Sequence, residues 1–96
     1  MTPEGKVKAK VKRILNRAEA YYFMPVQTGY GMPTLDFLCF HMGSGFAIEA
    51  KAPGKKPTKR QEAIIHEIEY SGSQVFVIDG TEGSYDSLIT FLECKK

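Results

Sequence analysis

Residues 35–51 read LDFLCFHMGSGFAIEAK, two apolar runs separated by Met42-Gly43-Ser44-Gly45. Apolar runs of this length on either side of a glycine-rich turn predict a β-hairpin, here with strands over residues 35–41 and 46–51. No other segment of the chain gives so strong a hairpin signal. The remaining segments are therefore interpreted as additions to this hairpin.

Three charged side chains, Asp36, Glu49 and Lys51, interrupt these apolar strands. Residues two apart on a strand share a face, so Glu49 and Lys51 point to the same side. With the turn centred on Gly43-Ser44, Asp36 lies opposite residues 49–51, directly or one diagonal step away, with Cβ atoms roughly 4.5–8 Å apart. Two carboxylates at that distance repel each other unless a proton or a cation lies between them.

A hard divalent cation such as Mg²⁺ binds an oxygen pair of this kind, and Lys51 beside it could stabilise charge on a phosphate. A cross-strand salt bridge on a solvated sheet face would use the same three residues. Two features favour the metal site. The acids interrupt apolar runs, and the basic residues 52–60 follow Lys51 directly, where a bound phosphate would lie.

The N-terminal third of the chain predicts a helix and a short strand. Thr2-Pro3-Glu4 is a helix start, with a hydroxyl N-cap, proline at the first position and an acid in the first turn. Apolar residues at helical spacing extend this helix over residues 3–19. Residues 21–24 are aromatic-rich and predict a strand that ends at Pro25. The glycines within residues 27–33 predict a loop able to approach a ligand closely.

The C-terminal half predicts a helix, a strand and a second helix. Thr58 and Gln61 form a capping box for a helix with an apolar face (Ala63, Ile64, Ile65, Ile68, Tyr70), which ends at Ser71-Gly72. Residues 74–79 predict a strand buried on both faces. After a turn over residues 80–83, a last helix begins at Ser84 or Tyr85.

These elements give the order α-β-β-β-α-β-α. The helix between the third and fourth strands favours a parallel crossover, so the expected fold is α/β, a small mixed β-sheet flanked by helices. The chain has 96 residues, 43% hydrophobic and 25% charged, and we interpret residues 1–96 as a single domain.

The composition also excludes several classes of protein. No apolar run approaches the roughly 18 residues that cross a bilayer, and no secretory signal is apparent. Two cysteines, Cys39 and Cys94, exclude a disulfide framework and a cysteine-rich zinc site. We therefore expect a cytoplasmic protein with no membrane partner and no organic cofactor.

Although the net charge is only +2, the chain contains two segments rich in lysine and arginine. Residues 1–20 hold six bases and two acids, and residues 51–60 hold five bases and no acid. Together they could form one positive face for a polyanion, or each could be a solvated surface. As phosphate contacts without base specificity we single out six residues: Lys6, Lys10, Lys55, Lys56, Lys59 and Arg60. Tyr21, Tyr22 and Tyr30 could stack on bases, although packing in or beside the core explains them better.

Four segments together resemble a known family: residues 31–36 (GMPTLD), residues 46–54 (FAIEAKAPG), Gln61, and residues 72–78 (GSQVFVI). They resemble the VRR-NUC domain, the virus-type replication-repair nuclease branch of the PD-(D/E)XK nuclease superfamily. Phage-encoded stand-alone members have about this length. The resemblance covers residues 2–78 and implies a restriction-endonuclease-like core.

The resemblance further implies a Mg²⁺- or Mn²⁺-dependent DNA endonuclease, selective for branched DNA or four-way junctions and acting as a homodimer. If phage-encoded, it would work in the host cytoplasm. Asp36 and Glu49 would bind the metal together with the backbone carbonyl of Ala50, and Lys51 would serve the hydrolytic water.

An acid on the first helix would complete the site, Glu4 in preference to Glu19, and Gln61 would lie beside Lys51 or act only as a helix cap. One departure concerns the loop before Asp36. Most members place the acid directly after the proline, whereas Thr34-Leu35 separate Pro33 from Asp36 here. Two other functions remain open: a catalytically silent nucleic-acid-binding module and a phage accessory interaction protein.

Overall fold

The central hairpin consists of β2 (Phe37–His41) and β3 (Ser44–Ala50), which pair antiparallel. Met42 and Gly43 form its turn with φ of 49° and 83°, the positive values that a two-residue type I′ turn requires. The predicted turn centre at Gly43-Ser44 is wrong by one residue, because Met42 adopts a left-handed conformation that few methionines take. β3 therefore begins at Ser44 rather than at Phe46.

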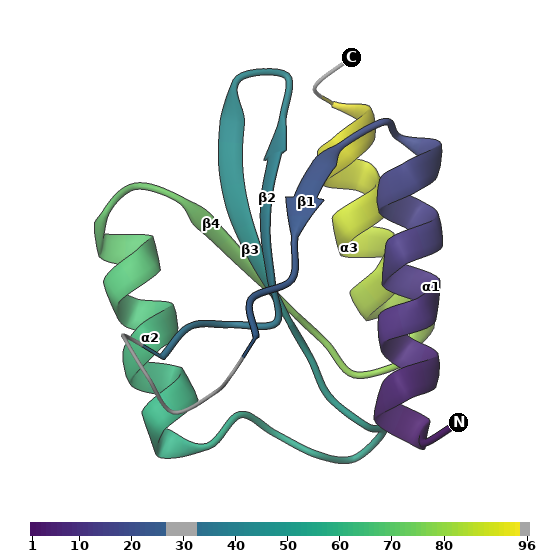
Figure 1. Cartoon of the computed structure of the whole chain (residues 1–96), viewed down its shortest axis with the longest axis vertical. Coiled ribbons are helices and arrows are strands. Elements are labelled where there is room, and N and C mark those ends of the chain that lie inside the picture. Colours follow the sequence, from purple (N-terminus) through teal and green to yellow (C-terminus); the bar gives the residue numbers. More distant parts are fainter. Residues whose placement is uncertain (27–32, 95–96) are drawn as a thin grey trace.

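The computed structural model describes residues 1–26 and 33–94, which contain four strands and three helices (Figure 1). β1 (Tyr21–Phe23) pairs antiparallel with β2, and β4 (Gln74–Ile78) pairs parallel with β3, so the strands lie in the order β1-β2-β3-β4. The predicted element order and the mixed sheet are confirmed. The predicted loop over residues 27–33, with Tyr30 in it, lies outside the described residues except for Pro33.

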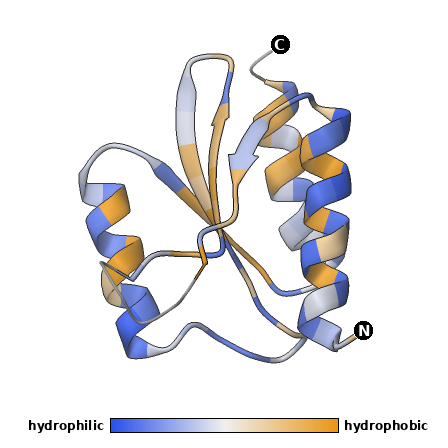
Figure 2. Cartoon of the chain, viewed as in Figure 1, coloured by the Kyte–Doolittle hydropathy of each residue, from blue (hydrophilic) through white to orange (hydrophobic). Residues whose placement is uncertain are grey.

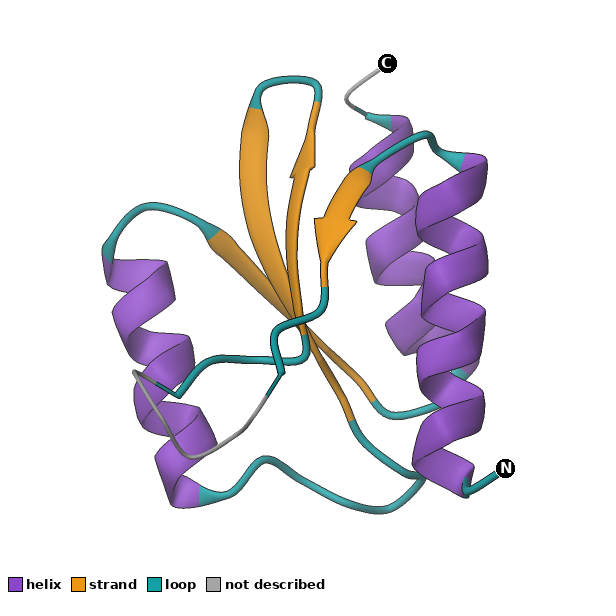
Figure 3. Ribbon diagram, viewed as in Figure 1, coloured by secondary structure: helices purple, strands orange, loops and turns teal. Residues whose placement is uncertain are grey.

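Helices cover both faces of the sheet (Figures 1 and 3). α1 (Pro3–Arg17) and α3 (Glu82–Glu93) lie together on one face, and α2 (Lys59–Tyr70) lies on the other. The main core forms between the sheet and the α1–α3 layer, and Figure 2 shows apolar residues on these two helices and along the strands. Its fully buried members include Val11, Leu15, Phe37, Ile48, Ala50, Ile78 and Leu88.

Several predicted boundaries shift for local reasons. α1 ends at Arg17 rather than at residue 19, because Ala18 caps the helix and Glu19 takes a left-handed φ of 59°. β2 begins at Phe37 instead of residue 35, and β3 and β4 end one residue early, at Ala50 and Ile78. α3 begins at Glu82, not at residue 84 or 85, because the Thr81 hydroxyl accepts a hydrogen bond from the Ser84 N–H and caps the helix.

One burial prediction is wrong. β4 is not buried on both faces: it is an edge strand, with Phe76 and Ile78 buried and Val77 exposed. The apolar face of α2 is only partly covered, since none of its residues is fully buried and Tyr70 is 95% exposed. The α2 side of the sheet is consequently the less protected one.

The loop from β3 to α2 packs against the turn that follows β4. Gly80 has φ of 89°, and a Cβ added to it would lie 3.2 Å from Cγ of Pro53 and 3.4 Å from Cγ2 of Val7. A glycine is therefore needed here both for its conformation and for the close approach of Pro53. This contact positions the start of the basic loop beside the first turns of α1.

None of the three helices found in residues 1–26 and 33–94 is both long enough and apolar enough to span a membrane.

We predict that Gly80→Ala lowers the free energy of unfolding by about 1–3 kcal/mol, because a Cβ at positive φ is strained and meets Pro53. Gly83→Ala is the matched control. Gly83 lies in α3 with open space around it, so alanine should raise stability by about 0.5 kcal/mol. Urea denaturation of the two variants measures both effects; equal stabilities would show that the Pro53 contact has no energetic role.

Candidate active site

Asp36 and Glu49 lie directly opposite each other at the end of the hairpin remote from its turn. The register ends with Phe37 opposite Ile48, so Asp36, which directly precedes β2, and Glu49 follow at the end of the paired region. The Asp36 N–H donates to Glu49 Oε1 at 3.3 Å, and the Ala50 N–H donates to Asp36 Oδ2 at 2.9 Å. Each carboxylate is thus held by the backbone of the other strand.

The Glu49 carboxyl is almost completely buried, with 3% of the residue exposed. Burial, followed by the repulsion of Asp36, raises the pKa of Glu49 to about 7, although Lys51 and the Asp36 N–H oppose the shift. A buried carboxylate next to a second acid is destabilised unless a positive charge approaches it. Binding of a cation or a proton therefore stabilises the two carboxylates.

Two ammonium groups supply part of this positive charge. Lys51 Nζ lies 3.6 Å from Glu49 Oε2, and Lys8 Nζ lies 3.5 Å from Asp36 Oδ1. Lys8 also pairs with Glu4 Oε2 at 3.4 Å. Partial burial works to lower the pKa of Lys8, but the attraction of Asp36 and Glu4 outweighs it and raises the pKa.

Lys8 is the site residue that sequence reasoning missed. Its only sequence signal is its position four residues after Glu4, a spacing that places both side chains on one face of α1. That the same face turns toward Asp36 follows from the packing of α1 on the sheet, which no local pattern reports.

Gln61 joins α2 to the carboxylate pair. Its Oε1 accepts a hydrogen bond from the Thr58 N–H at 3.0 Å, and its Nε2 donates to Glu49 Oε2 at 2.8 Å. The predicted capping box is confirmed. The amide therefore acts as a helix cap through one atom and fixes Glu49 through the other, so the two interpretations of this residue are compatible.

Of the two candidate acids near α1, only Glu4 lies on the side of Asp36, through its ion pair with Lys8. Glu19 lies past the far end of the helix, about 22 Å away along the axis, and is exposed. Glu4 is close enough to contribute to the raised pKa of Glu49. The site thus gathers three carboxylates and two ammonium groups, a net charge of −1.

The donor set suits a hard cation such as Mg²⁺ or Mn²⁺, since the residual negative charge resides on carboxylate oxygens around a buried position. Among residues 1–26 and 33–94 no three His, Cys, Asp or Glu side chains lie close enough to hold a metal ion together, and of the three acids here Asp36 and Glu49 are the predicted ligands. The backbone carbonyl of Ala50 as a further ligand stays a prediction.

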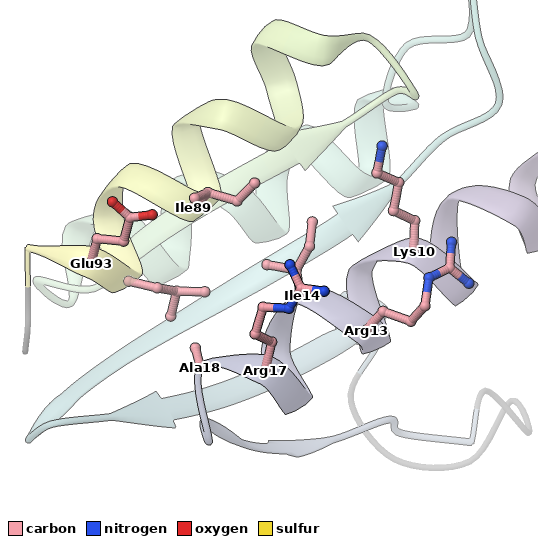
Figure 4. Close-up of a pocket in the computed structure, with 8 residues that line it drawn as sticks. Lys10, Arg13, Ile14, Arg17, Ala18, Ile89 and Glu93 are labelled. Carbon is pink, nitrogen blue, oxygen red and sulfur yellow. The ribbon is translucent and has the colours of Figure 1, made fainter.

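The predicted phosphate contacts divide into two groups. Lys55, Lys56, Lys59 and Arg60 are exposed in the loop and first turn that follow Lys51. Lys10 instead lies on the α3 side, with Nζ 4.3 Å from the centre of the Tyr85 ring, and Lys6 precedes it by one turn. Lys10 also lines a cavity of about 310 Å³ between α1 and α3 (Figure 4). Arg13, Ile14, Arg17 and Ile89 line the same cavity. The structure therefore does not bring Lys6 and Lys10 together with the carboxylates.

Other reactive side chains lie elsewhere. Cys39 is in the core, where burial raises the pKa of its thiol to about 12, so it is not a nucleophile. His41 is buried at the turn end of β2, about 17 Å from Asp36 along the strand, and its Nε2 has no hydrogen-bond partner among the described residues.

We predict that, with a chelator present, the wild-type protein loses stability as pH rises from 5 to 8. Between the ordinary Glu pKa of 4.5 and about 7, only the folded state keeps the Glu49 proton, so raising the pH removes this advantage. The loss should be on the order of 2–3 kcal/mol, and Glu49→Gln should abolish it. Urea denaturation at both pH values measures the difference; parallel pH profiles for the two proteins would contradict the prediction.

With this geometry in place, comparison with models of known protein families finds no match, and comparison with curated proteins finds no significant relative.

Proposed function

We propose that this protein is a Mg²⁺- or Mn²⁺-dependent endodeoxyribonuclease that hydrolyses phosphodiester bonds. The observation that carries the proposal is the opposed pair of Asp36 and buried Glu49, with the Lys51 ammonium 3.6 Å from the Glu49 carboxylate. The resemblance of residues 46–54 to the VRR-NUC domain gives the same reaction class. On this proposal the α/β fold is a restriction-endonuclease-like core.

Asp36, Glu49 and the Ala50 carbonyl would hold the metal, which supplies Lewis-acid activation of water and of the scissile phosphate when bound. Lys51 stabilises negative charge that develops on the phosphate, from a position fixed by Glu49. Gln61 of α2 fixes the orientation of Glu49 through a hydrogen bond, and Lys8 of α1 forms ion pairs with Asp36 and Glu4. These roles require no movement of the strands.

The substrate proposed is DNA, bound through its phosphates. The exposed lysines and arginine of the β3–α2 loop and the first turn of α2 follow Lys51 in the chain, and they are the groups proposed to bind the phosphates. Symmetrical cutting of a four-way junction needs two sites, which a C2 homodimer supplies. Branched DNA and a homodimer, in phage replication, recombination or repair, are accordingly part of the proposal.

One observation favours a second candidate, a catalytically silent nucleic-acid-binding module. Each of the four carboxylate oxygens of Asp36 and Glu49 already has a donor within the chain, either an N–H or an ammonium. In such a module Asp36 and Glu49 would only stabilise the fold through these hydrogen bonds and ion pairs. No structural observation favours a phage accessory interaction protein.

We predict that Asp36→Asn and Glu49→Gln each abolish cleavage in Mg²⁺ or Mn²⁺ while changing DNA affinity less than about threefold. Either change removes a negatively charged ligand without removing a phosphate contact, and loss of such a group typically costs several orders of magnitude in rate. Matched junction, flap, duplex and single-stranded substrates, each with metal or chelator, measure the activity.

Asp86→Asn and Glu62→Gln, at exposed positions on α3 and α2, are the controls and should cut normally. Wild-type rates in either site variant would disprove the assignment of the carboxylates. Metal-independent binding without any cleavage by the wild-type protein would instead support the silent module.

We predict that replacing Lys55, Lys56 and Lys59 together by Gln lowers the slope of log affinity against log salt by roughly 2–3, equally for all sequences. Each lost phosphate contact releases one counterion fewer. The comparison variant replaces Lys6 and Lys10, which lie on the α3 side. If the slope changes for the Lys6 and Lys10 variant and not for the triple variant, the DNA binds on the α1–α3 side instead.

A further inference from the structure

The outer half of the α2-side sheet face carries three exposed aromatic rings. Tyr21, Phe23 and Phe40 are 68%, 55% and 60% exposed. We call these three residues the aromatic face. The hairpin end of the sheet extends beyond α2 in Figure 1, so this helix does not cover them. By contrast Tyr22 points to the opposite face and packs on Phe37 in the core.

Strand pairing makes the three rings one surface. The register places Tyr21 beside Phe40 and Phe23 beside Leu38, and the rings of Tyr21 and Phe40 have centroids 6.4 Å apart. On the other side of Phe40 lies Gly45, where an added Cβ would be 3.5 Å from the Phe40 ring. The missing side chain keeps this part of the surface low and open.

The aromatic face and the candidate active site share one side of the sheet. Leu38 and Phe40 alternate with the core residues Phe37 and Cys39, and Glu49 on β3 lies between the core residues Ile48 and Ala50, so all three project to the same side. Gly45, the partner of Phe40, lies four positions along β3 from Glu49, about 13 Å. This span equals about four stacked nucleotides at 3.4 Å each.

Resting on the function proposed above, we propose that the aromatic face binds unpaired bases of the substrate by stacking, while the adjoining strand enters the Asp36–Glu49 site. Exposed rings offer a surface to any base, because every base has a π-face, and one such contact typically tightens binding about five- to a hundredfold. The protein would therefore select DNA with unpaired nucleotides next to the cut.

A second copy of the chain is a weaker explanation for this surface. Three rings of 150–250 Å² at these exposures offer on the order of 300–450 Å², whereas each partner of a stable complex usually buries about 800 Å². The face also lies on the same side of the sheet as Glu49, where the proposed function places a phosphate backbone.

A tryptophan reporter tests the proposal directly, because the chain contains none. Phe40→Trp places one indole on the aromatic face, and Tyr70→Trp, on α2 where Tyr70 is 95% exposed, is the matched control. With a chelator present to prevent cleavage, a single-stranded dT12 should quench the Phe40→Trp emission at least twofold at saturation. A blunt duplex should not, and the control should respond to neither.

Affinity provides the second measurement. Tyr21→Ala with Phe40→Ala should weaken dT12 binding at least tenfold and duplex binding less than twofold. Phe40→Leu keeps an apolar side chain without a ring and should still lose at least threefold for dT12, which separates stacking from unfolding.

The outcomes distinguish this inference from the proposed function. DNA binding without quenching of the Phe40→Trp emission would overturn the inference alone, and quenching with undiminished cleavage by Asp36→Asn would support it while overturning the catalytic assignment. Failure of dT12 to bind, or a dimer that Tyr21→Ala with Phe40→Ala dissociates at unchanged dT12 affinity, would overturn the inference.

Discussion

The register of the β2–β3 hairpin is the constraint on which the site depends. A two-residue turn at Met42-Gly43 pairs Phe37 with Ile48 and so sets Asp36 against Glu49. Because side chains alternate along a strand, a slip of one residue would send one carboxylate into the core and one core residue to the surface. The buried partners Phe37 and Ile48 make such a slip costly, and the same packing that stabilises the core therefore keeps the two acids together.

Gathering these charged groups at a partly buried position lowers the stability of the folded protein. Burial of Glu49 opposes its ionisation, and Asp36 adds to that opposition. Two ammonium groups and a Gln61 amide compensate only in part, leaving one negative charge in excess over the five charged groups. These partners come from α1, from the residue that follows β3 and from α2, so all three segments must be in place before the carboxylates have these partners.

The two sides of the sheet differ in what they do. The α1–α3 side contains the packed core, including the mutually contacting rings of Phe46, Phe76 and Phe91. The α2 side is only partly covered, and it carries Glu49 and the exposed rings. The packed core and the exposed rings thus lie on opposite faces of the same strands, and both α1 and α2 reach the carboxylate pair at the strand ends.

Local sequence signals were sufficient for the element order, the caps at Thr2 and Thr58, and the pairing of Asp36 with the residues around Glu49, because these depend on neighbours along the chain or across one turn. Only the tertiary structure decided that Lys8 faces Asp36, that Lys10 faces α3, and that Tyr21 is exposed while Tyr22 is half-buried against the core. These outcomes depend on how α1 is rotated against the sheet and where α2 ends above it. Both are set by packing between segments distant in sequence, which no short pattern encodes.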